Sequence, residues 1–311
     1  MALLRLIKYP GSKNVLIPEI YRVFRLSGLR MMVDVFGGSG SVALNVKAEM
    51  NVYNDYEIEL AEMFRAIQEK PDETRKLLSQ ILRYLQQPHT SAEKRRLTGH
   101  PLGAQSGRRL IEYIEEWEFH RQSIPNVARR SRNRQGRLPT IEERSVYTIY
   151  KFSSSFGGMG KTYATTREKS VQRFVSKTLE NFAAIENRVS RWKIENMDFR
   201  DLIKKYDSPG AFFYLDPPYV GKQWYNYDFT KNDFTDIKSV IGKLQGKFLM
   251  NLNLDVDYFR EIFGNPTFVR YYPDNNSRLG NGNQSKGKAF YTNVDLPTNV
   301  RSKRAHSQGN L

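Results

Sequence analysis

Five consecutive apolar residues, Ala211-Phe212-Phe213-Tyr214-Leu215, run directly into Asp216-Pro217-Pro218-Tyr219. An apolar run of this length is typical of a buried strand. Proline lacks a backbone donor and fixes φ, so the two prolines end the strand immediately after the aspartate. Because open α/β sheets bind their ligands at the carboxyl ends of the strands, this junction predicts an α/β fold with Asp216 at its binding edge.

The first 55 residues predict the same architecture. A helical pattern over 14–26 precedes an apolar run over 31–36, which ends at the glycine turn 37–40. A short helix over 41–49 and a second strand ending at Asp55 follow. Glycines after a strand let the backbone approach a ligand, and an acid after the next strand can accept hydrogen bonds from both hydroxyls of a ribose. An ordinary tight turn and a surface aspartate are the alternative interpretation.

The rest of the chain returns to alternating helices and strands. We expect helices over 58–87, 170–191, 198–205, 231–244 and 255–263, strands over 193–197 and 246–252, and an antiparallel pair over 267–272 and 288–294. This pattern predicts one discontinuous catalytic domain, residues 1–60 and 166–297. A mainly helical, basic region, residues 61–165, is inserted into it, and residues 298–311 form a flexible tail.

Charge indicates the partner. The chain carries 49 Lys and Arg against 33 Asp and Glu, a formal net charge of +16. Such an excess is typical of proteins that bind a polyanion, most often nucleic acid and less often an anionic membrane surface. Five arginines without an acid fall within nine residues of the insertion: Arg129, Arg130, Arg132, Arg134 and Arg137. They predict contacts with a DNA backbone, with a solvated loop as the alternative.

Several classes of protein are excluded or disfavoured by what the sequence lacks. There is no cysteine, which excludes disulfides, iron–sulfur clusters, thiolate zinc sites and cysteine nucleophiles. The four histidines form no HxxxH or HExxH pair, so we expect no metal. No stretch approaches the ~18–20 apolar residues that cross a bilayer, and the N-terminus has no signal-peptide cleavage site, so we expect neither a membrane-bound nor a secreted protein.

The tetrapeptide after the 211–215 run also predicts a ligand. A carboxylate at Asp216 and a proline carbonyl can together accept both hydrogens of an amino group, while Tyr219 stacks on the ring that carries it. This is a site for an exocyclic amine on a planar base.

Five motifs occur in the order found in Dam-type adenine-specific DNA methyltransferases: Lys8–Lys13, Asp34–Gly40, Asp55, Asn196–Phe199 and Asp216–Tyr219. The chain resembles their D12 class, also called the α-group, over about 1–60 and 170–295. The resemblance implies a Rossmann-like sheet with S-adenosylmethionine as cofactor and double-stranded DNA as partner. The middle third does not align, and residues 151–163 match the family's aromatic-Asn-Gly loop only loosely.

The resemblance also implies roles for individual residues. The catalytic residues would be Asp216, Pro217, Pro218 and Tyr219. The cofactor site would comprise Tyr9, Gly11, Lys13, Asp34, Phe36, Gly37, Gly38, Gly40, Asp55, Asp198, Phe199 and Asp216. Within it, Phe36, Gly37 and Gly40 would line the methionine part, Asp55 the ribose, and Asp198 with Phe199 the adenine. Lys8 and Lys161 would contact DNA together with the arginine run.

The implied reaction is site-specific methylation of the N6 amine of an adenine that is flipped out of the duplex. A cytosine N4 methyltransferase would use the same arrangement, although Asp rather than Ser before the prolines favours adenine. A non-catalytic DNA-binding protein that kept the fold is the second alternative, but it would be expected to have lost Asp216 or Asp55. The implied setting is the cytoplasm of a bacterial, archaeal or phage-infected cell, with a cognate restriction endonuclease as a candidate partner.

Overall fold

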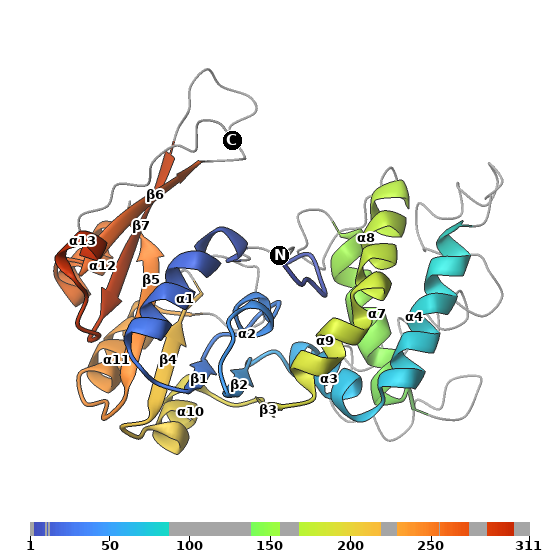
Figure 1. Cartoon of the computed structure of the whole chain (residues 1–311), viewed down its shortest axis with the longest axis horizontal. Helices are drawn as coiled ribbons and strands as arrows, with labels where there is room; N and C mark the ends of the chain where they lie inside the picture. The colour runs from blue at the N-terminus through green and yellow to red at the C-terminus, as the bar shows by residue number, and fades with distance from the viewer. Residues whose placement is uncertain are drawn as a thin grey trace. The chain divides into compact units, whose positions relative to one another are not determined.

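The computed structural model describes residues 3–9, 11, 13–86, 138–155, 168–218, 229–254, 256–273 and 285–301. Its internal contacts divide the chain into two compact units. The helical unit comprises residues 1–12, 38–40 and 57–194, and the sheet unit comprises residues 13–37, 41–56 and 195–311. Figure 1 labels the helices and strands of both.

The sheet has seven strands in the order β3-β2-β1-β4-β5-β7-β6. Their bounds are β1 Met31–Asp34, β2 Met50–Asn54, β3 Trp192–Glu195, β4 Ala211–Leu215, β5 Lys247–Asn253, β6 Phe268–Pro273 and β7 Ser285–Thr292. β1 pairs in parallel with β2 and β4, and β4 with β5, whereas β7 is antiparallel to β5 and β6. The chain moves outward from β1 to β3 and then returns to the other side of β1 at β4, so the strand order reverses between β1 and β4. Such a reversal is where open α/β sheets bind ligands.

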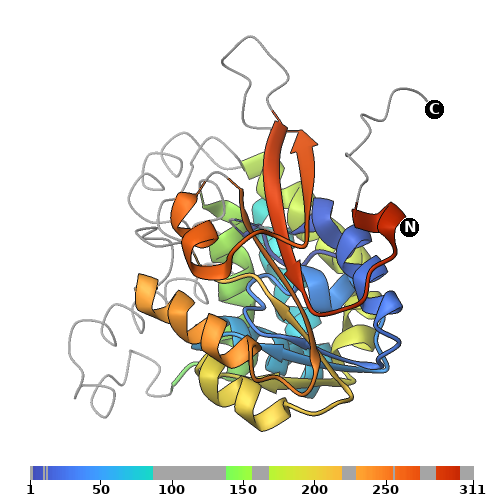
Figure 2. The same ribbon diagram turned by 90° about the vertical axis from the view of Figure 1, so that its left-hand side faces the viewer.

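Helices cover both faces of this sheet, as the doubly wound class requires. On one face lie α10 (Phe199–Tyr206), α11 (Lys231–Ile241) and α12 (Asp257–Phe263), which pack against alternate strand residues such as Phe213 and Leu215. On the other face lie α1 (Ile17–Leu26), preceded by the turn Asn14–Leu16, together with α2 (Ser41–Asn45) and α13 (Thr298–Arg301). Phe212 and Tyr214 point toward this second group. Figure 2 shows the orange helices α11 and α12 on one side of the sheet and blue α1 with red α13 on the other.

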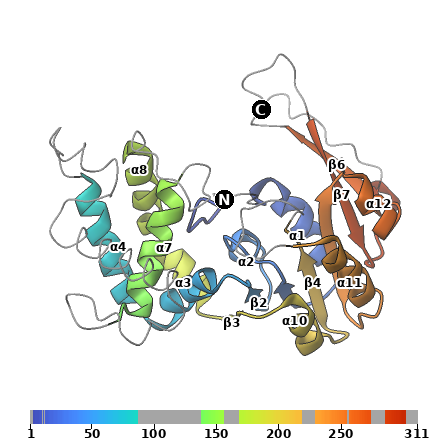
Figure 3. The same ribbon diagram turned by 180° about the vertical axis from the view of Figure 1, so that it is seen from behind.

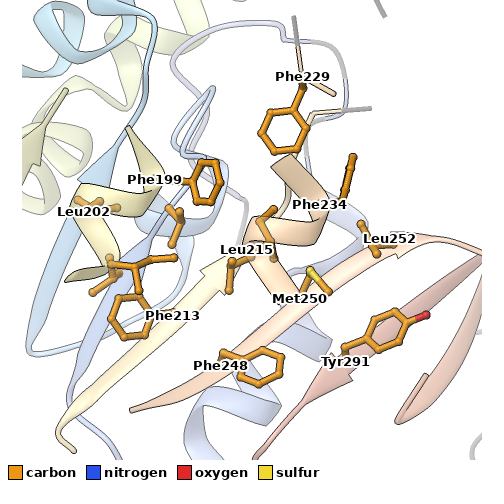
Figure 4. Packing of buried hydrophobic residues seen from close by; sticks show 14 of the residues in the cluster. Phe199, Leu202, Phe213, Leu215, Phe229, Phe234, Phe248, Met250, Leu252 and Tyr291 are labelled. Atoms are coloured by element: carbon orange, nitrogen blue, oxygen red, sulfur yellow. The ribbon is translucent and has the colours of Figure 1, made fainter. Parts of the chain in front are cut away.

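Aromatic side chains fill the first of these two cores. Phe199, Phe229 and Phe234 lie above Phe213 and Leu215, and β5 contributes Met250 and Leu252 (Figure 4). The predicted α/β class is therefore confirmed, and so is the antiparallel pair at the C-terminal edge of the sheet.

The helical unit contains α3 (Ile58–Glu69), α4 (Pro71–Gln86), α7 (Ile141–Ser154), α8 (Glu168–Glu180) and α9 (Phe182–Val189), which Figure 3 shows from behind. The helical pattern over 58–87 is confirmed, and it forms two helices, because Pro71 lacks the backbone N–H that would continue α3 and instead begins α4. The helix expected over 170–191 is also two, divided at Asn181.

The contact-defined units differ from the predicted domain limits at both ends of the chain. Residues 1–12, 38–40 and 57–60 are predicted in the catalytic domain but belong to the helical unit by their contacts. Residues 166–194 are also predicted in the catalytic domain, and contacts group them with the helical unit as well. The reason is that α3 is bonded to α9 and to the start of β3. Gln68 Nε2 donates to the carbonyls of Val189 and Trp192 at 2.8 and 2.9 Å, and Phe64 packs against the ring of Trp192.

No helix among the described residues is long and apolar enough to span a bilayer.

Candidate active site

The strand reversal between β1 and β4 brings two aspartates together in the sheet unit. Asp34 is the last residue of β1 and is paired in register with Tyr214 of β4, and the N–H of Val35 donates to the Tyr214 carbonyl at 3.0 Å. Asp216 follows two residues after Tyr214. The predicted placement of Asp216, directly beyond a fully buried strand, is what the structure has.

Both oxygens of the Asp216 carboxylate are engaged. Lys13 Nζ lies 2.5 Å from Oδ2, and Asn251 Nδ2 donates to Oδ1 at 3.1 Å. The side chains of Lys13 and Asp216 are only 10% and 15% exposed, so this ion pair is largely shielded from water. Asn251 in turn accepts a hydrogen bond from the Tyr214 hydroxyl. A carboxylate held at both oxygens has its plane fixed before any substrate arrives.

Asp34 is the most unusual titratable group of the site. It is 1% exposed, and its Oδ2 atom is buried and has no hydrogen-bond partner among the described residues. Burial raises the pKa of Asp34 from 3.8 to about 8, and the negative charge of Asp216 adds to the effect, while the backbone N–H of Ala43 and the charge of Lys13 oppose it. The carboxyl group is therefore mostly protonated at neutral pH.

Two asparagines fix the segment around Asp55. Asn54, the last residue of β2, donates through Nδ2 to the Val35 and Met197 carbonyls at 3.0 and 3.2 Å and accepts from the Met197 N–H at 3.0 Å. Asn196 Nδ2 donates to the Asp55 carbonyl at 2.8 Å. These bonds tie the end of β2 to the residues that lead into α10, so Asp55 and Asp198 belong to one locally braced region.

Asp198 begins α10 as its N-cap. Its Oδ1 accepts from the Arg200 N–H at 2.8 Å, and the Arg200 guanidinium lies 3.0 Å from Oδ2. The same guanidinium contacts Asp233 and Asp236 at the start of α11, at 2.5 and 2.6 Å. Although burial opposes the charged form, hydrogen bonds to these acids outweigh it and raise the pKa of Arg200. Arg200 thus clamps α10 to α11 beside Asp198.

Three phenylalanines lie together next to this clamp. Ring centroids are 5.6 Å apart for Phe36 and Phe199, 5.8 Å for Phe36 and Phe229, and 6.0 Å for Phe199 and Phe229. The structure therefore brings the predicted residues Phe36 and Phe199 together and adds Phe229, which is buried. A planar base is the kind of ligand that such rings accommodate by stacking.

No three His, Cys, Asp or Glu side chains gather into a metal-binding group anywhere in the part of the chain that the structure describes.

Comparison with known proteins decides the family. Residues 9–277 match the sequence profile of the D12 class N6 adenine-specific DNA methyltransferases. The chain belongs to this family. It is also similar to the modification methylase StsI of Streptococcus sanguinis, with 36% identity over 75 residues. That match covers 24% of this chain and 11% of StsI, so the chain spans only a small part of that protein's length.

As a D12 family member, the chain has the expected glycine turn. At two positions of this turn, close packing within the protein is enough to explain why the residue is glycine. A Cβ at Gly37 would come within 2.3 Å of the Tyr53 ring and 2.9 Å of the Asn54 carbonyl oxygen. Within the helical unit, a Cβ at Gly40, whose φ is +66°, would come within 2.5 Å of the Phe64 ring. These glycines therefore do not by themselves demonstrate a ligand.

The remaining predicted residues of the N-terminal motif lie in the helical unit. Tyr9 packs over Gly38, and Gly11 has a φ of 76°. Lys8, predicted to contact DNA, donates to Ser170 Oγ at 3.2 Å and to the Ser153 carbonyl at 3.4 Å. Its ammonium is thus engaged within the protein. Pro217 is buried and Pro218 half-buried in the sheet unit.

Several predicted residues lie outside the described part of the chain and stay predictions: Tyr219, Lys161, Arg129, Arg130, Arg132, Arg134 and Arg137.

Sequence reasoning missed Asn251, Tyr214, Phe229 and Arg200. The signal for Asn251 was present as a polar residue inside the apolar run Phe248–Leu252. Because an unpartnered amide in a buried strand is costly, such an interruption indicates a specific hydrogen-bond partner. The other three carry no local signal that sets them apart from core or surface residues.

Proposed function

We propose that the protein transfers a methyl group from S-adenosylmethionine to the N6 amine of adenine in double-stranded DNA. The observation that carries the proposal is Asp216, held at both carboxylate oxygens and followed by two prolines at the reversal of the strand order. Membership of the D12 family supports the choice of adenine in DNA.

The residues of the sheet unit fit the cofactor. Asp34 offers a buried oxygen that no group in the described part of the chain bonds, and Asp55 offers a carboxylate beside the braced segment that leads to Asp198. The ring cluster of Phe36, Phe199 and Phe229 suits a planar base. When bound, S-adenosylmethionine supplies an electrophilic methyl group. Carboxylates and rings of this kind hold ribose hydroxyls and an adenine in place.

The protein's part in the reaction is to present the amine. The lone pair of an exocyclic amine is delocalised into its ring, which makes the amine a weak nucleophile. Asp216 and the Pro217 carbonyl would accept its two hydrogens and draw the nitrogen toward tetrahedral geometry, which frees the lone pair for in-line attack. Tyr219 would stack on the flipped base. The proton leaves late, so Asp216 need not be a strong base.

The positive net charge of the chain supports the proposal that it binds DNA. Neutralising Arg129, Arg130, Arg132, Arg134 and Arg137 to Gln should weaken duplex binding across all sequences and leave cofactor affinity intact. Each lost phosphate contact should reduce the slope of the logarithm of the DNA-binding constant against the logarithm of the salt concentration by about 0.9. A salt titration that gives the same slope for wild type and the five-fold variant would move the DNA-binding face elsewhere on the chain.

Action on duplex DNA would place the protein in the cytoplasm of a bacterial, archaeal or phage-infected cell, where a cognate endonuclease is a candidate partner.

The direct test is to incubate the protein with duplex DNA and methyl-labelled cofactor, and to identify the product nucleoside by mass spectrometry. N6-methyladenine is expected. N4-methylcytosine would instead establish the cytosine-amine reaction. Binding of DNA and cofactor without any transfer would establish a non-catalytic role.

A further inference from the structure

We infer that Asn251, oriented by Tyr214, is a positioning residue that fixes the Asp216 carboxylate for methyl transfer, an inference that rests on the proposed function. Neither residue belongs to the motifs by which the sequence resembles its family. Both are buried, with Asn251 0% and Tyr214 1% exposed.

The strand register creates the contact. β4 and β5 are parallel, and Leu215 pairs with Met250, so Asp216 and Asn251 each follow one residue further along their strands. Tyr214 is two residues before Asp216, and Leu249, its partner on β5, is two residues before Asn251. Tyr214, Asp216 and Asn251 consequently share one face of the sheet, the face covered by α1 and α2.

The Tyr214 hydroxyl holds the Asn251 amide in the orientation that the Asp216 carboxylate, which can only accept, requires. The hydroxyl donates to Asn251 Oδ1, which leaves Nδ2 directed at Asp216 Oδ1. A flipped amide would place its oxygen against the carboxylate oxygen, where two acceptors would oppose each other with no hydrogen between them. Tyr214 therefore acts on Asp216 through Asn251.

Asn251 and Lys13 divide the two oxygens of Asp216 between them. Lys13 holds Oδ2 by charge from the segment that precedes α1, whereas Asn251 holds Oδ1 by a neutral hydrogen bond from within the sheet. Because β-strands are far stiffer than side-chain ion pairs, the strand-borne bond is the better determinant of the angle of the carboxylate plane. Each oxygen keeps a further lone pair to accept a hydrogen of the target amine.

Core stability does not explain an asparagine at this position. Its neighbours on β5, from Phe248 to Leu252, are otherwise apolar and buried. An apolar side chain would fill the same space without the cost of burying an amide. The polar residue is explained by the carboxylate that it bonds.

The test compares Asn251→Leu and Tyr214→Phe with two matched controls. Asn253→Leu removes an amide from the same strand that bonds Lys288 instead of Asp216, and Tyr291→Phe removes a hydroxyl that bonds the Gly264 carbonyl. Single-turnover methyl transfer is measured at saturating cofactor and DNA, together with the cofactor Kd and thermal unfolding.

We expect Asn251→Leu to slow transfer about 10- to 100-fold and Tyr214→Phe about 3- to 10-fold, with cofactor Kd within about twofold of wild type. The double variant should be no slower than Asn251→Leu alone, because Tyr214 acts through Asn251. The two controls should transfer at close to the wild-type rate. The inference would be overturned if Asn251→Leu or Tyr214→Phe folds and transfers methyl at an unchanged rate. Additive losses of rate in the double variant would also overturn it.

A second measurement separates this inference from the proposed function. Crystal structures of wild type and Tyr214→Phe report the orientation of the Asp216 carboxylate without any activity. A wild-type protein that transfers no methyl group would overturn the proposed function. An Asp216 carboxylate that keeps its orientation in Tyr214→Phe would overturn the positioning role, whether or not Asn251→Leu folds.

Discussion

The two faces of the sheet carry different kinds of side chain near the carboxyl ends of the parallel strands. On the face covered by α1 and α2, strand ends carry Asp34, Asp216 and Asn251, all in register-defined positions. On the face covered by α10 and α11, the corresponding region is an aromatic cluster of Phe36 and Phe199 with Phe229. We call these the polar side and the aromatic side.

The difference indicates a division of labour. On the polar side, donors and acceptors are matched at single atoms, which suits a reaction that depends on the angle of one carboxylate. On the aromatic side, rings and a three-acid clamp around Arg200 define a shape, which suits the binding of a planar group. Changes at Asp216 and Asn251 on the polar side should therefore lower turnover, and changes on the aromatic side should lower cofactor affinity.

The largest effect is expected for Asp216→Ala. Methyl transfer should fall by about a hundredfold to a thousandfold, because the amine loses an acceptor that is aligned for the transition state. Cofactor Kd should change little. Single-turnover transfer of labelled methyl checks this, with Asp201→Ala on the exposed surface of α10 as the control for loss of a carboxylate. Transfer within tenfold of wild type would mean that the polar side does not carry the chemistry.

A stability effect is expected for Asp34→Asn. The pKa of Asp34 is raised to about 8 in the folded protein, so the folded state holds a proton that the unfolded state releases above about pH 4. Its contribution to stability is fully present below pH 3.8 and is lost as the pH rises through about 8. Asparagine cannot ionise, so between pH 4 and pH 8 the free energy of unfolding of the variant should rise relative to that of wild type by about 5 kcal/mol.

Urea unfolding at pH 4, 6 and 8 measures this difference, with Asp201→Asn as the exposed control. If the free energies of unfolding of wild type and Asp34→Asn change in parallel with pH, Asp34 is ionised in the folded protein. The polar side would then carry two neighbouring negative charges instead of one.

Sequence alone was sufficient where the signal was local. The β4 strand and Asp216 follow from an apolar run that ends in two prolines, and both are found where they were predicted. It was insufficient where contacts join distant segments. Tyr214 and Asn251 are 37 residues apart and meet only through the parallel register of β4 and β5. Phe229 joins its ring cluster in the same non-local way.

The division into units was also beyond local signals. Composition separated a basic middle region from the two ends of the chain, but residues 166–194 join the helical unit through bonds from α3 that no pattern reveals. The end of a helix at Pro71, by contrast, was available from the sequence, because proline cannot continue a helix.

Asp55→Ala tests the aromatic side. The bond from Asn196 ties Asp55 to the segment that enters α10, so we group it with that side. Charge-assisted hydrogen bonds are worth about 1.5–3 kcal/mol each, and S-adenosylmethionine affinity should fall about 10- to 100-fold. The rate at saturating cofactor should stay close to wild type. Calorimetry that gives an unchanged Kd would remove Asp55 from the cofactor site, and a lowered saturating rate would contradict the division between the two sides.

The smallest effect is expected for Arg200→Lys, and it tests whether the clamp matters through shape. Lysine keeps the charge but lacks the planar fork that reaches Asp198 and the two acids of α11 together. Because the Arg200 side chain is 35% exposed, solvent screens these pairs, and we expect a loss of only about 1 kcal/mol in the free energy of unfolding.

Cofactor affinity of Arg200→Lys should fall severalfold, because Asp198 and the start of α10 lose a fixed partner, while the saturating rate should be preserved. Lys205→Gln is the matched control. Lys205 lies on the same helix as Arg200, but its ion pair is with Glu195 at the end of β3, away from the clamp. Urea unfolding and calorimetry on both variants separate the outcomes. Equal affinity losses in Arg200→Lys and Lys205→Gln would show that α10 responds to net charge, not to the geometry of the clamp. A loss of rate without a loss of affinity would place Arg200 functionally with the polar side.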